Sequence, residues 1–311
     1  MHAIELLGYQ PNVHARRLVT QSVETIGFVL SNRDFLNPFH AGVLTGVEHA
    51  AAAMRHEILY ASCVYAPETP AAELELPPVL RSRGLVGGVI LAGTNYPNLV
   101  RAVRERGIPF IVFGNNLVRQ RQSLPDCCVY YDDASSSREL VERLIAMGHR
   151  RIAFAGDQRQ PWFARRRAAY LQAMARHHLA TMEYTAALDS PHSYVAYGEA
   201  ALGKLLERHP APTALFAGND NIAVGAWRLC HRRGIKIPGD LSLAGFDDLE
   251  MAVLIDPPLT TVRVPVDEVG RACVEMMVEK IRRPGEPQAN RSIPTHLVER
   301  ASWGPPPPEG A

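Results

Sequence analysis

The feature that most constrains the fold is a repeated alternation of short apolar runs with longer segments of helical periodicity. In the first half of the chain the apolar runs are IGFVL, ILYASCVY, GGVILAG and PFIVFGN. A second series, RIAFAG, TALFAG and LSLAGF, follows Tyr131 and is interspersed with helical segments at 162–178, 193–209 and 220–233. Continuous apolar strands that alternate with helices are typical of parallel sheets covered on both faces. The sequence therefore predicts an α/β protein built from two successive doubly wound units.

Polar residues at the ends of the apolar runs indicate where a ligand would bind. Six runs lead into such pairs, which are Ser31–Asn32, Thr94–Asn95, Asn115–Asn116, Asp157–Gln158, Asn219–Asp220 and Asp247–Asp248. In open parallel sheets, ligands bind outside the carboxyl ends of the strands. Donors and acceptors of this kind suit a neutral ligand rich in hydroxyl or amide groups. Each residue taken alone more simply caps a helix or forms an Asx turn, but six pairs together favour a ligand crevice.

Charge and cysteine content narrow the function. The chain has 33 Lys and Arg residues against 32 Asp and Glu residues, so any contact with nucleic acid must come from a local element. Five cysteines without paired spacing indicate reduced thiols rather than a zinc or redox site. The sequence shows neither the pattern of a signal peptide nor an apolar run long enough to span a membrane. We therefore expect a soluble cytoplasmic protein without membrane contacts.

Three stretches of the sequence carry a resemblance to one family. Within 212–273, the segments PTALFAGND, GIKIPGDLSLAGFDD and DPPLTTVR form the strongest part. LIAMGHRRIAF, from Leu144, is a second match, and 27–39, with its Asn-Pro-Phe ending, is a third. These stretches resemble the effector core of the lactose-repressor/galactose-repressor (LacI/GalR) family of transcription regulators. The likeness extends over 3–303, which is nearly the whole chain.

The resemblance implies the periplasmic-binding-protein type I fold, in which two Rossmann-like lobes are joined by three crossing segments and hold an effector between them. We expect 24–130 and 265–292 to form the first lobe, and 131–264 and 293–303 to form the second. The terminal segment 304–311 contains four successive prolines, which can continue neither a helix nor a central strand. We expect this terminal segment to be disordered.

The same resemblance assigns effector contacts. Arg166 matches the arginine of the family's Arg-x-x-Gly-aromatic pattern, with Ala169 in place of the glycine, and Asp247 matches the acidic residue after Gly-aromatic. An arginine offers a fixed fork of donors and a carboxylate accepts two hydroxyls, so the pair can hold a polyol or a sugar acid. Alternatively, Arg166 belongs to a solvated helix face and Asp247 caps the next segment. The predicted effector set is Asn37, Phe39, Trp162, Arg166, Asn219 and Asp247, with Phe39 or Trp162 stacking on a sugar ring.

The first residues resemble the end of a DNA-binding headpiece and its hinge helix, so 1–23 is interpreted as a remnant of both. Asn12 can cap a short helix over 13–20, whose arginines would contact phosphates, and in the family the leucine that matches Leu18 wedges between base pairs. The resemblance thereby predicts DNA contacts for Asn12, Ala15, Arg16 and Leu18. A helix of about two turns is too short to be stable alone, and we expect it to be frayed in the free chain.

Met1 falls inside what resembles the last helix of that headpiece. Either the start is misplaced or the headpiece has been lost, and we favour a misplaced start. The apolar residues Ile4, Leu6, Leu7 and Tyr9 would otherwise have little to pack against. An in-frame stop codon just upstream would contradict this interpretation. Without a recognition helix in the major groove, we expect this polypeptide not to bind an operator with useful specificity.

The leading hypothesis for function is the effector-responsive core of a transcriptional repressor. Its expected partners are an effector of the sugar, sugar acid or nucleobase class, operator DNA where the headpiece is present, and a second copy of the chain. A homodimer fits the twofold symmetry of operators, and no heptad pattern for a tetramer follows the core.

Two other classes of function remain as alternatives. A solute-binding protein would have the same fold, but the hinge sequence GYQPN and the missing signal peptide argue against it. An enzyme is the third option, and the chain has no Walker A loop, no GxSxG elbow and no HExxH helix. We therefore predict no catalytic residues, no metal and no cofactor.

Overall fold

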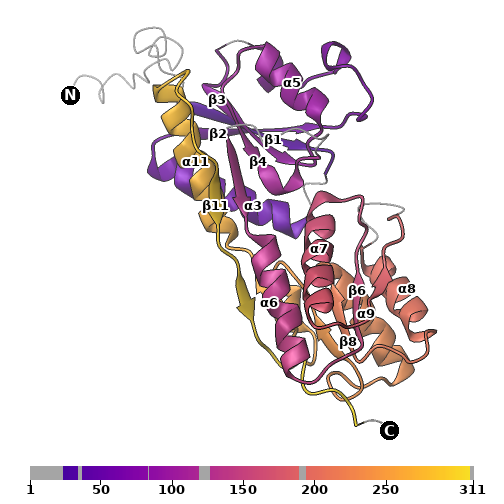
Figure 1. Cartoon of the computed structure of the whole chain (residues 1–311). Helices are drawn as coiled ribbons and strands as arrows, with labels where there is room; N and C mark the ends of the chain where they lie inside the picture. Colours follow the sequence, from indigo (N-terminus) through magenta and orange to yellow (C-terminus); the bar gives the residue numbers. More distant parts are fainter. Residues whose placement is uncertain (1–23, 34–36, 83, 119–126, 189–193, 309–311) are drawn as a thin grey trace.

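The computed structural model of the chain describes residues 24–33, 37–82, 84–118, 127–188 and 194–308. Within these residues the chain forms two lobes, each built around its own parallel sheet (Figure 1). The predicted hinge contacts Asn12, Ala15, Arg16 and Leu18 lie outside the described residues. The predicted two-lobed α/β architecture is confirmed.

A six-stranded parallel sheet forms the centre of the first lobe, in the order β11-β5-β4-β3-β1-β2. Its strands are β1 (Thr25–Ser31), β2 (Glu57–Cys63), β3 (Gly88–Gly93), β4 (Phe110–Phe113), β5 (Cys128–Tyr131) and β11 (Arg291–Ile293). Strands β1 and β3 are buried along their whole length. Their sequences are therefore continuously apolar, whereas the edge strand β2 is partly exposed and more polar.

Glycines bring the two long helices of the first lobe together. The helical segments of this lobe are α3 (Pro38–Ala53), η1 (Ala71–Glu73), α4 (Pro78–Arg81), α5 (Pro97–Glu105), η2 (Gly114–Asn116) and α11 (Val266–Arg282). Helices α3 and α11 pack against each other, and α5 lies across the sheet from them (Figure 1). A Cβ at Gly46 would lie 2.8 Å from the Cα of Asp267, and a Cβ at Gly270 would lie 2.5 Å from the carbonyl carbon of Gly46. Backbone contact at this crossing thus requires glycine in both helices.

The second lobe contains a four-stranded parallel sheet in the order β7-β6-β8-β9. Its elements are α6 (Asp133–Ala146), β6 (Ile152–Ala155), α7 (Pro161–Arg176), β7 (Met182–Tyr184), α8 (Tyr194–Leu206), β8 (Ala214–Ala217), α9 (Asp220–Arg233), β9 (Ser242–Ala244) and α10 (Met251–Leu254). Helices α7, α8 and α9 agree with the segments predicted from periodicity to within three residues. Gly234, with φ of 67°, ends α9 in the left-handed conformation that favours glycine.

The tight packing of α8 on α9 gives a test of the fold. A Cβ at Gly198 would clash with the carbonyl oxygen of Ile222, whereas a Cβ at Gly203, on the same helix, would lie 3.8 Å from its nearest neighbour, a methyl carbon of Leu229. We expect Gly198→Ala to destabilise the protein by about 2–3 kcal/mol through overpacking. The matched variant Gly203→Ala should stabilise it by about 0.5–1 kcal/mol, because alanine favours helix. Urea unfolding of both variants checks this, and equal effects would contradict the packing described.

Three segments of the described chain cross between the lobes. They connect β5 to α6, β10 (Thr261–Arg263) to α11, and β11 to β12 (His296–Val298). Strands β10 and β12 pair antiparallel in a small two-stranded sheet beside these crossings. The chain therefore leaves and re-enters each lobe, so a shift of one lobe against the other acts on all three connections together.

The terminal segment begins with an ordered residue. The Gly304 carbonyl accepts hydrogen bonds from His149 Nε2 at 2.8 Å and from Ser242 Oγ at 3.0 Å, and His149 Nδ1 lies 2.9 Å from Thr213 Oγ1. Burial lowers the pKa of His149, which favours the neutral imidazole that this pairing needs. The expectation of disorder from 304 onward is therefore wrong for Gly304, because a buried histidine distant in sequence binds its carbonyl.

Candidate ligand site between the lobes

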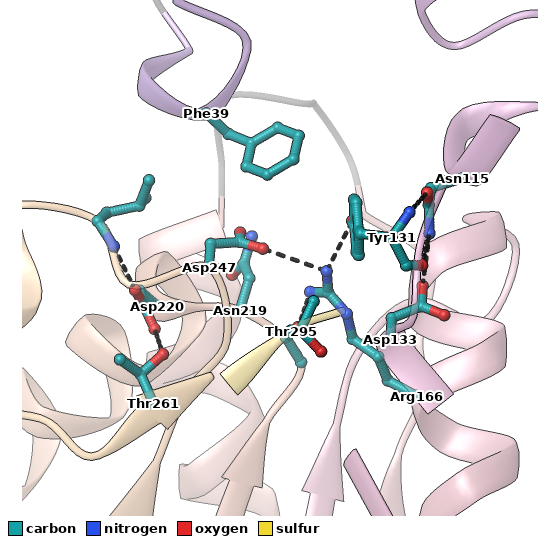
Figure 2. A network of polar contacts seen from close by, with 12 residues as sticks. Phe39, Asn115, Tyr131, Asp133, Arg166, Asn219, Asp220, Asp247, Thr261 and Thr295 are labelled. Carbon is teal, nitrogen blue, oxygen red and sulfur yellow. Dashed lines mark hydrogen bonds and ion pairs between the residues drawn. The ribbon is translucent and has the colours of Figure 1, made fainter. Parts of the chain in front are cut away.

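A cavity that is partly open to solvent lies between the two lobes. The structure brings all six predicted effector residues to its lining: Asn37 and Phe39 from the first lobe, and Trp162, Arg166, Asn219 and Asp247 from the second. Figure 2 shows Phe39 reaching from the first lobe toward Arg166 and Asp247 in the second.

Arg166 is the most deeply buried charged residue of this cavity, with a side chain that is 1% exposed. Its Nη1 donates to the Gly218 carbonyl at 2.5 Å, and its Nη2 donates to Tyr131 Oη at 3.0 Å and to Asp247 Oδ1 at 3.1 Å (Figure 2). The guanidinium carbon also lies 3.6 Å from the centre of the Phe246 ring. An ion pair, hydrogen bonds and an aromatic face together compensate the cost of burying this cation. Arg166 is therefore not part of a solvated helix face.

Asp247 follows β9 in an unusual backbone conformation. Its φ is 111°, in a region that favours glycine, and its N–H is held by the Val262 carbonyl at 2.8 Å. Burial raises the pKa of the carboxyl to about 6, and the Arg166 guanidinium opposes that rise. Oδ1 is used by Arg166, whereas Oδ2 accepts no hydrogen bond from the described residues. The strained loop thus presents one unoccupied carboxylate oxygen at the cavity.

The two asparagines of the predicted set both cap helices. Asn37 Oδ1 accepts from the Phe39 N–H at 3.1 Å at the start of α3, and Asn219 Oδ1 accepts from the Ile222 N–H at 3.0 Å at the start of α9. Capping uses the oxygen of each amide, and within the described residues the Nδ2 groups make no hydrogen bond. The capping alternative is therefore correct for Asn219, and Asn37 caps its helix in the same way. Each amide keeps two donors that a ligand in the cavity can use.

Aromatic side chains line the contact between the lobes. The Phe39 ring stacks on Phe113 at 6.1 Å between centroids, and Tyr131 lies 6.0 Å from Phe39 and 6.4 Å from Phe246. Trp162 lies in the first turn of α7, and the guanidinium carbon of Arg33 lies over its ring, 4.6 Å from the ring centre. Phe39 and Trp162 thus each have a stacking partner within the protein, Phe113 and Arg33 respectively.

Sequence reasoning missed Arg33, which spans the mouth of the cavity. It follows β1 in the first lobe, where its Nε donates to Thr94 Oγ1 at 2.9 Å. Its Nη1 and Nη2 cross to the second lobe and donate to Tyr194 Oη at 3.1 Å and to Gln160 Oε1 at 3.0 Å. The only sequence signal was its place beside the Ser31–Asn32 strand end. The missed lining residues also include Tyr131, whose run of apolar neighbours in β5 concealed a hydroxyl that serves Arg166.

Several other strand-end residues are structural rather than ligand-facing. Asn115 Oδ1 accepts from the Tyr131 N–H at 2.8 Å while its Nδ2 donates to the Tyr131 carbonyl at 2.9 Å. Asp157 is held by the side chain of Arg159 and the N–H of Leu188. The simpler Asx interpretation is right for Asp157, whose Oδ1 also accepts from the Arg159 N–H at 3.0 Å, whereas Asn115 pairs with the backbone of Tyr131 in β5.

Asp220 supports the loop that carries Asp247. It is fully buried, and its two oxygens accept from Thr261 Oγ1 at 2.6 Å and from the Leu249 N–H at 2.8 Å (Figure 2). Burial raises the pKa of Asp220 well above its ordinary value, and the nearby carboxylates of Asp247 and Asp248 add to the rise. The protonated form is therefore favoured in the folded protein and the ionised form in the unfolded chain.

This pKa shift predicts a pH-dependent effect of Asp220→Asn. Because the pKa is raised on folding, the wild type loses stability as the pH rises from the unfolded value toward the folded one. Asparagine removes that loss and can still accept from Leu249 and donate to Thr261. We expect the variant's melting temperature, relative to the wild type, to be higher at about pH 8 than at about pH 5. If the melting temperature of the variant relative to the wild type is the same at both pH values, or higher at about pH 5, the raised pKa of Asp220 is contradicted.

Comparisons with known proteins agree with this architecture. The model of the periplasmic binding protein-like domain family matches residues 141–303. The HTH-type transcriptional regulator CelR of Thermobifida fusca is 31% identical over 308 residues, which covers 96% of this chain and 87% of that protein. The chain belongs to the LacI/GalR family of transcriptional regulators.

Solved structures of LacI-family proteins superpose on this chain. A transcriptional regulator CelR–cellobiose complex has a TM-score of 0.76 and 26% identity, and it covers 97% of this chain and 88% of its own. A LacI-family regulator of Enterococcus faecium with bound ribose has a TM-score of 0.74 and 25% identity, and it covers 90% and 99% of the two chains. This LacI-family chain is therefore the ligand-responsive core of a transcriptional regulator, as the sequence predicts.

No helix among the described residues is both long and apolar enough to cross a membrane. Nowhere in the same part of the chain do three or more His, Cys, Asp or Glu side chains gather in a way that could hold a metal ion. All five cysteines are buried, and none of them forms a disulfide.

Proposed function

We propose that the cavity binds a sugar-like effector and that this binding controls how the regulator holds DNA. The observation that carries the proposal is the Arg166–Asp247 pair, because it fixes one carboxylate oxygen at the cavity with no partner among the described residues. That oxygen accepts a ligand hydroxyl, the amides of Asn37 and Asn219 donate to ligand oxygens, and Phe39 covers an apolar face of the ring. The relatives with bound cellobiose and ribose support this ligand class.

Lobe closure is the proposed route from effector to DNA. The cavity takes residues from both lobes, so an effector that contacts both favours the arrangement in which they are closer. It can shift that equilibrium only by its difference in affinity for the two arrangements. The hinge positions Asn12, Ala15, Arg16 and Leu18 would then report the shift to DNA, and their role remains a prediction from sequence.

A thermal-shift screen tests the proposed ligand class. The wild-type chain is mixed with sugars, sugar acids, nucleosides and purines, because a ligand that binds only the folded state stabilises it by RT ln(1 + [L]/Kd). We expect stabilisation by sugars or sugar acids. Stabilisation by purines alone would show that the ligand is a purine and not a sugar. Catalytic turnover of a bound sugar would contradict the proposal that the protein is a regulator. The solute-binding alternative is not favoured, since the relatives compared above are transcriptional regulators.

A homodimer is part of the proposal. Among the described residues, large apolar side chains that are more than half exposed occur at Val64, after the edge strand β2, and at Val253 and Leu254 in α10. Leu254 is 73% exposed, which suits contact with a second copy of the chain. We expect the wild type to sediment as a dimer and Leu254→Asp to shift it toward monomer, with the surface variant Glu105→Gln as control. A wild-type tetramer, or a Leu254→Asp dimer of unchanged affinity, would contradict this.

A further inference from the structure

The charges around the cavity are unbalanced. Arg166 is paired with Asp247, whereas within the described residues the hydrogen bonds of Arg33 go only to the neutral groups of Thr94, Gln160 and Tyr194. Among the described residues no carboxylate lies within ion-pair distance of the Arg33 guanidinium. The mouth of the cavity therefore carries a positive charge that the described residues leave uncompensated.

The neighbouring histidine does not change this charge balance. His40 lines the same cavity and is 5% exposed, and its Nδ1 has no hydrogen-bond partner among the described residues. Burial, together with the nearby Arg33 cation, lowers the pKa of His40 to about 3. His40 is thus neutral at physiological pH, and the surplus charge belongs to Arg33 alone.

Several side chains of the cavity already accept a hydrogen bond within the protein, which leaves them mainly donors to offer a ligand. Asn37 and Asn219 have used their oxygens as helix caps, which leaves their NH₂ groups. The hydroxyls of Tyr131 and Tyr194 accept from Arg166 and Arg33 respectively, which leaves their own protons to donate. Among the described lining residues, the free oxygen of Asp247 is the acceptor that cannot also donate, whereas the amides of Asn116 and Asn221 can do either. A lining of this kind is matched best by a ligand with more acceptors than a neutral sugar has.

We propose that Arg33 is a specificity-determining residue that selects an effector bearing an anionic oxygen group, a carboxylate or a phosphate. The proposal rests on the proposed sugar-sensing function and adds the charge class of the ligand. The anionic group lies at Arg33 and the sugar hydroxyls lie at Asp247. Guanidinium groups suit such anions because their N–H donors form a planar fork.

The position of Arg33 links this recognition to lobe closure. The residue comes from the first lobe, whereas Gln160, Trp162 and Tyr194 belong to the second. An anion at Arg33 also receives the Tyr194 hydroxyl proton and therefore contacts both lobes at the mouth of the cavity. A purely structural Arg33, which only ties the lobes together, would instead affect charged and neutral ligands alike.

Calorimetric titration of the full chain with matched ligand pairs tests the proposal. The probes are glucose against glucuronate and glucose 6-phosphate, galactose against galacturonate, and ribose against ribose 5-phosphate. We expect the anionic member of at least one set to bind the wild type at least about tenfold more tightly than its neutral partner, as charge-assisted hydrogen bonds predict. The uronate and phosphate arms show which kind of anion is preferred.

Variants at Arg33 separate recognition from structure. Arg33→Gln should remove the preference for the anionic member by weakening its binding about tenfold more than that of the neutral sugar, and Arg33→Lys should retain part of the preference. Arg101→Gln, an exposed arginine on α5, is the charge-matched control and should keep the full preference. Higher ionic strength should weaken the binding of the anionic ligand and leave the binding of the neutral sugar unchanged.

Two outcomes would overturn the proposal in distinguishable ways. If neutral sugars bind the wild type as tightly as their anionic partners, or if Arg33→Gln weakens both members equally, Arg33 does not select charge and the sugar-sensing function stands. If no member of any set binds the wild type, the proposed sugar class fails together with this inference.

Discussion

The Asp247→Asn variant is expected to lose the stabilisation that a sugar effector gives the wild type, and to melt at a lower temperature without ligand because the buried Arg166 loses its charge partner. The amide oxygen can still accept from Arg166, whereas an NH₂ group replaces Oδ2 and cannot accept a ligand hydroxyl. Loss of a hydrogen bond to a charged acceptor costs about 2–3 kcal/mol, so we expect Kd to rise by about 30- to 150-fold. Calorimetric titration with the ligand selected by the thermal-shift screen measures this change.

The same substitution at a strand end outside the cavity is the control. Asp157 is bound by Arg159 and Leu188 and does not line the cavity, so Asp157→Asn should leave the Kd unchanged. Alanine at 247 is a poorer test, because it removes the acceptor of the Arg166 hydrogen bond as well as the charge and so destabilises the fold further. Equal affinities of the wild type and Asp247→Asn would show that the effector does not use this carboxylate.

Arg166→Met is expected to cause the largest loss of stability, about 3–5 kcal/mol, as for other broken buried ion pairs. Methionine fills a similar volume but leaves the Gly218 carbonyl, the Tyr131 hydroxyl and the Asp247 carboxylate without their common donor. The stacking of the guanidinium on Phe246 is lost as well. The free energy of unfolding from urea titration gives the measurement.

Its neighbour in sequence provides a matched control. Arg165 forms an ion pair with Asp133 at 2.8 Å, but its side chain is 33% exposed. Water can therefore replace part of the lost interaction, and we expect Arg165→Met to cost about 1 kcal/mol or less. If the two variants were equally stable, the network around Arg166 would not contribute to the fold as described.

Much of the fold could be predicted because local pattern determines it. The strands β1, β3, β6 and β8 are buried on both faces, and this burial required the uninterrupted apolar runs that the sequence shows. Motif matching selected Arg166 and Asp247 as effector contacts, and the structure brings their side chains into contact with each other. Their partnership is visible in the sequence only through the family resemblance, since 80 residues separate them.

Other features depended on how distant parts of the chain approach each other. Arg33 matters because Gln160 and Tyr194 come within reach of its guanidinium only after the two lobes pack. Gly304 is ordered because the buried imidazole of His149 needs an acceptor. Neither residue stands in a local pattern that differs from an ordinary surface loop, so propensity and periodicity gave no reason to select it.

A crystal structure of the chain with the ligand selected by the screen would show directly whether the effector binds at the Arg166–Asp247 pair. We expect the ligand between the lobes, with a hydroxyl within about 3.2 Å of Asp247 Oδ2. Phe39 should lie against its ring, and any anionic group should lie at Arg33. A ligand bound elsewhere on the protein, or one between the lobes without contact to Asp247 and Arg166, would contradict the account.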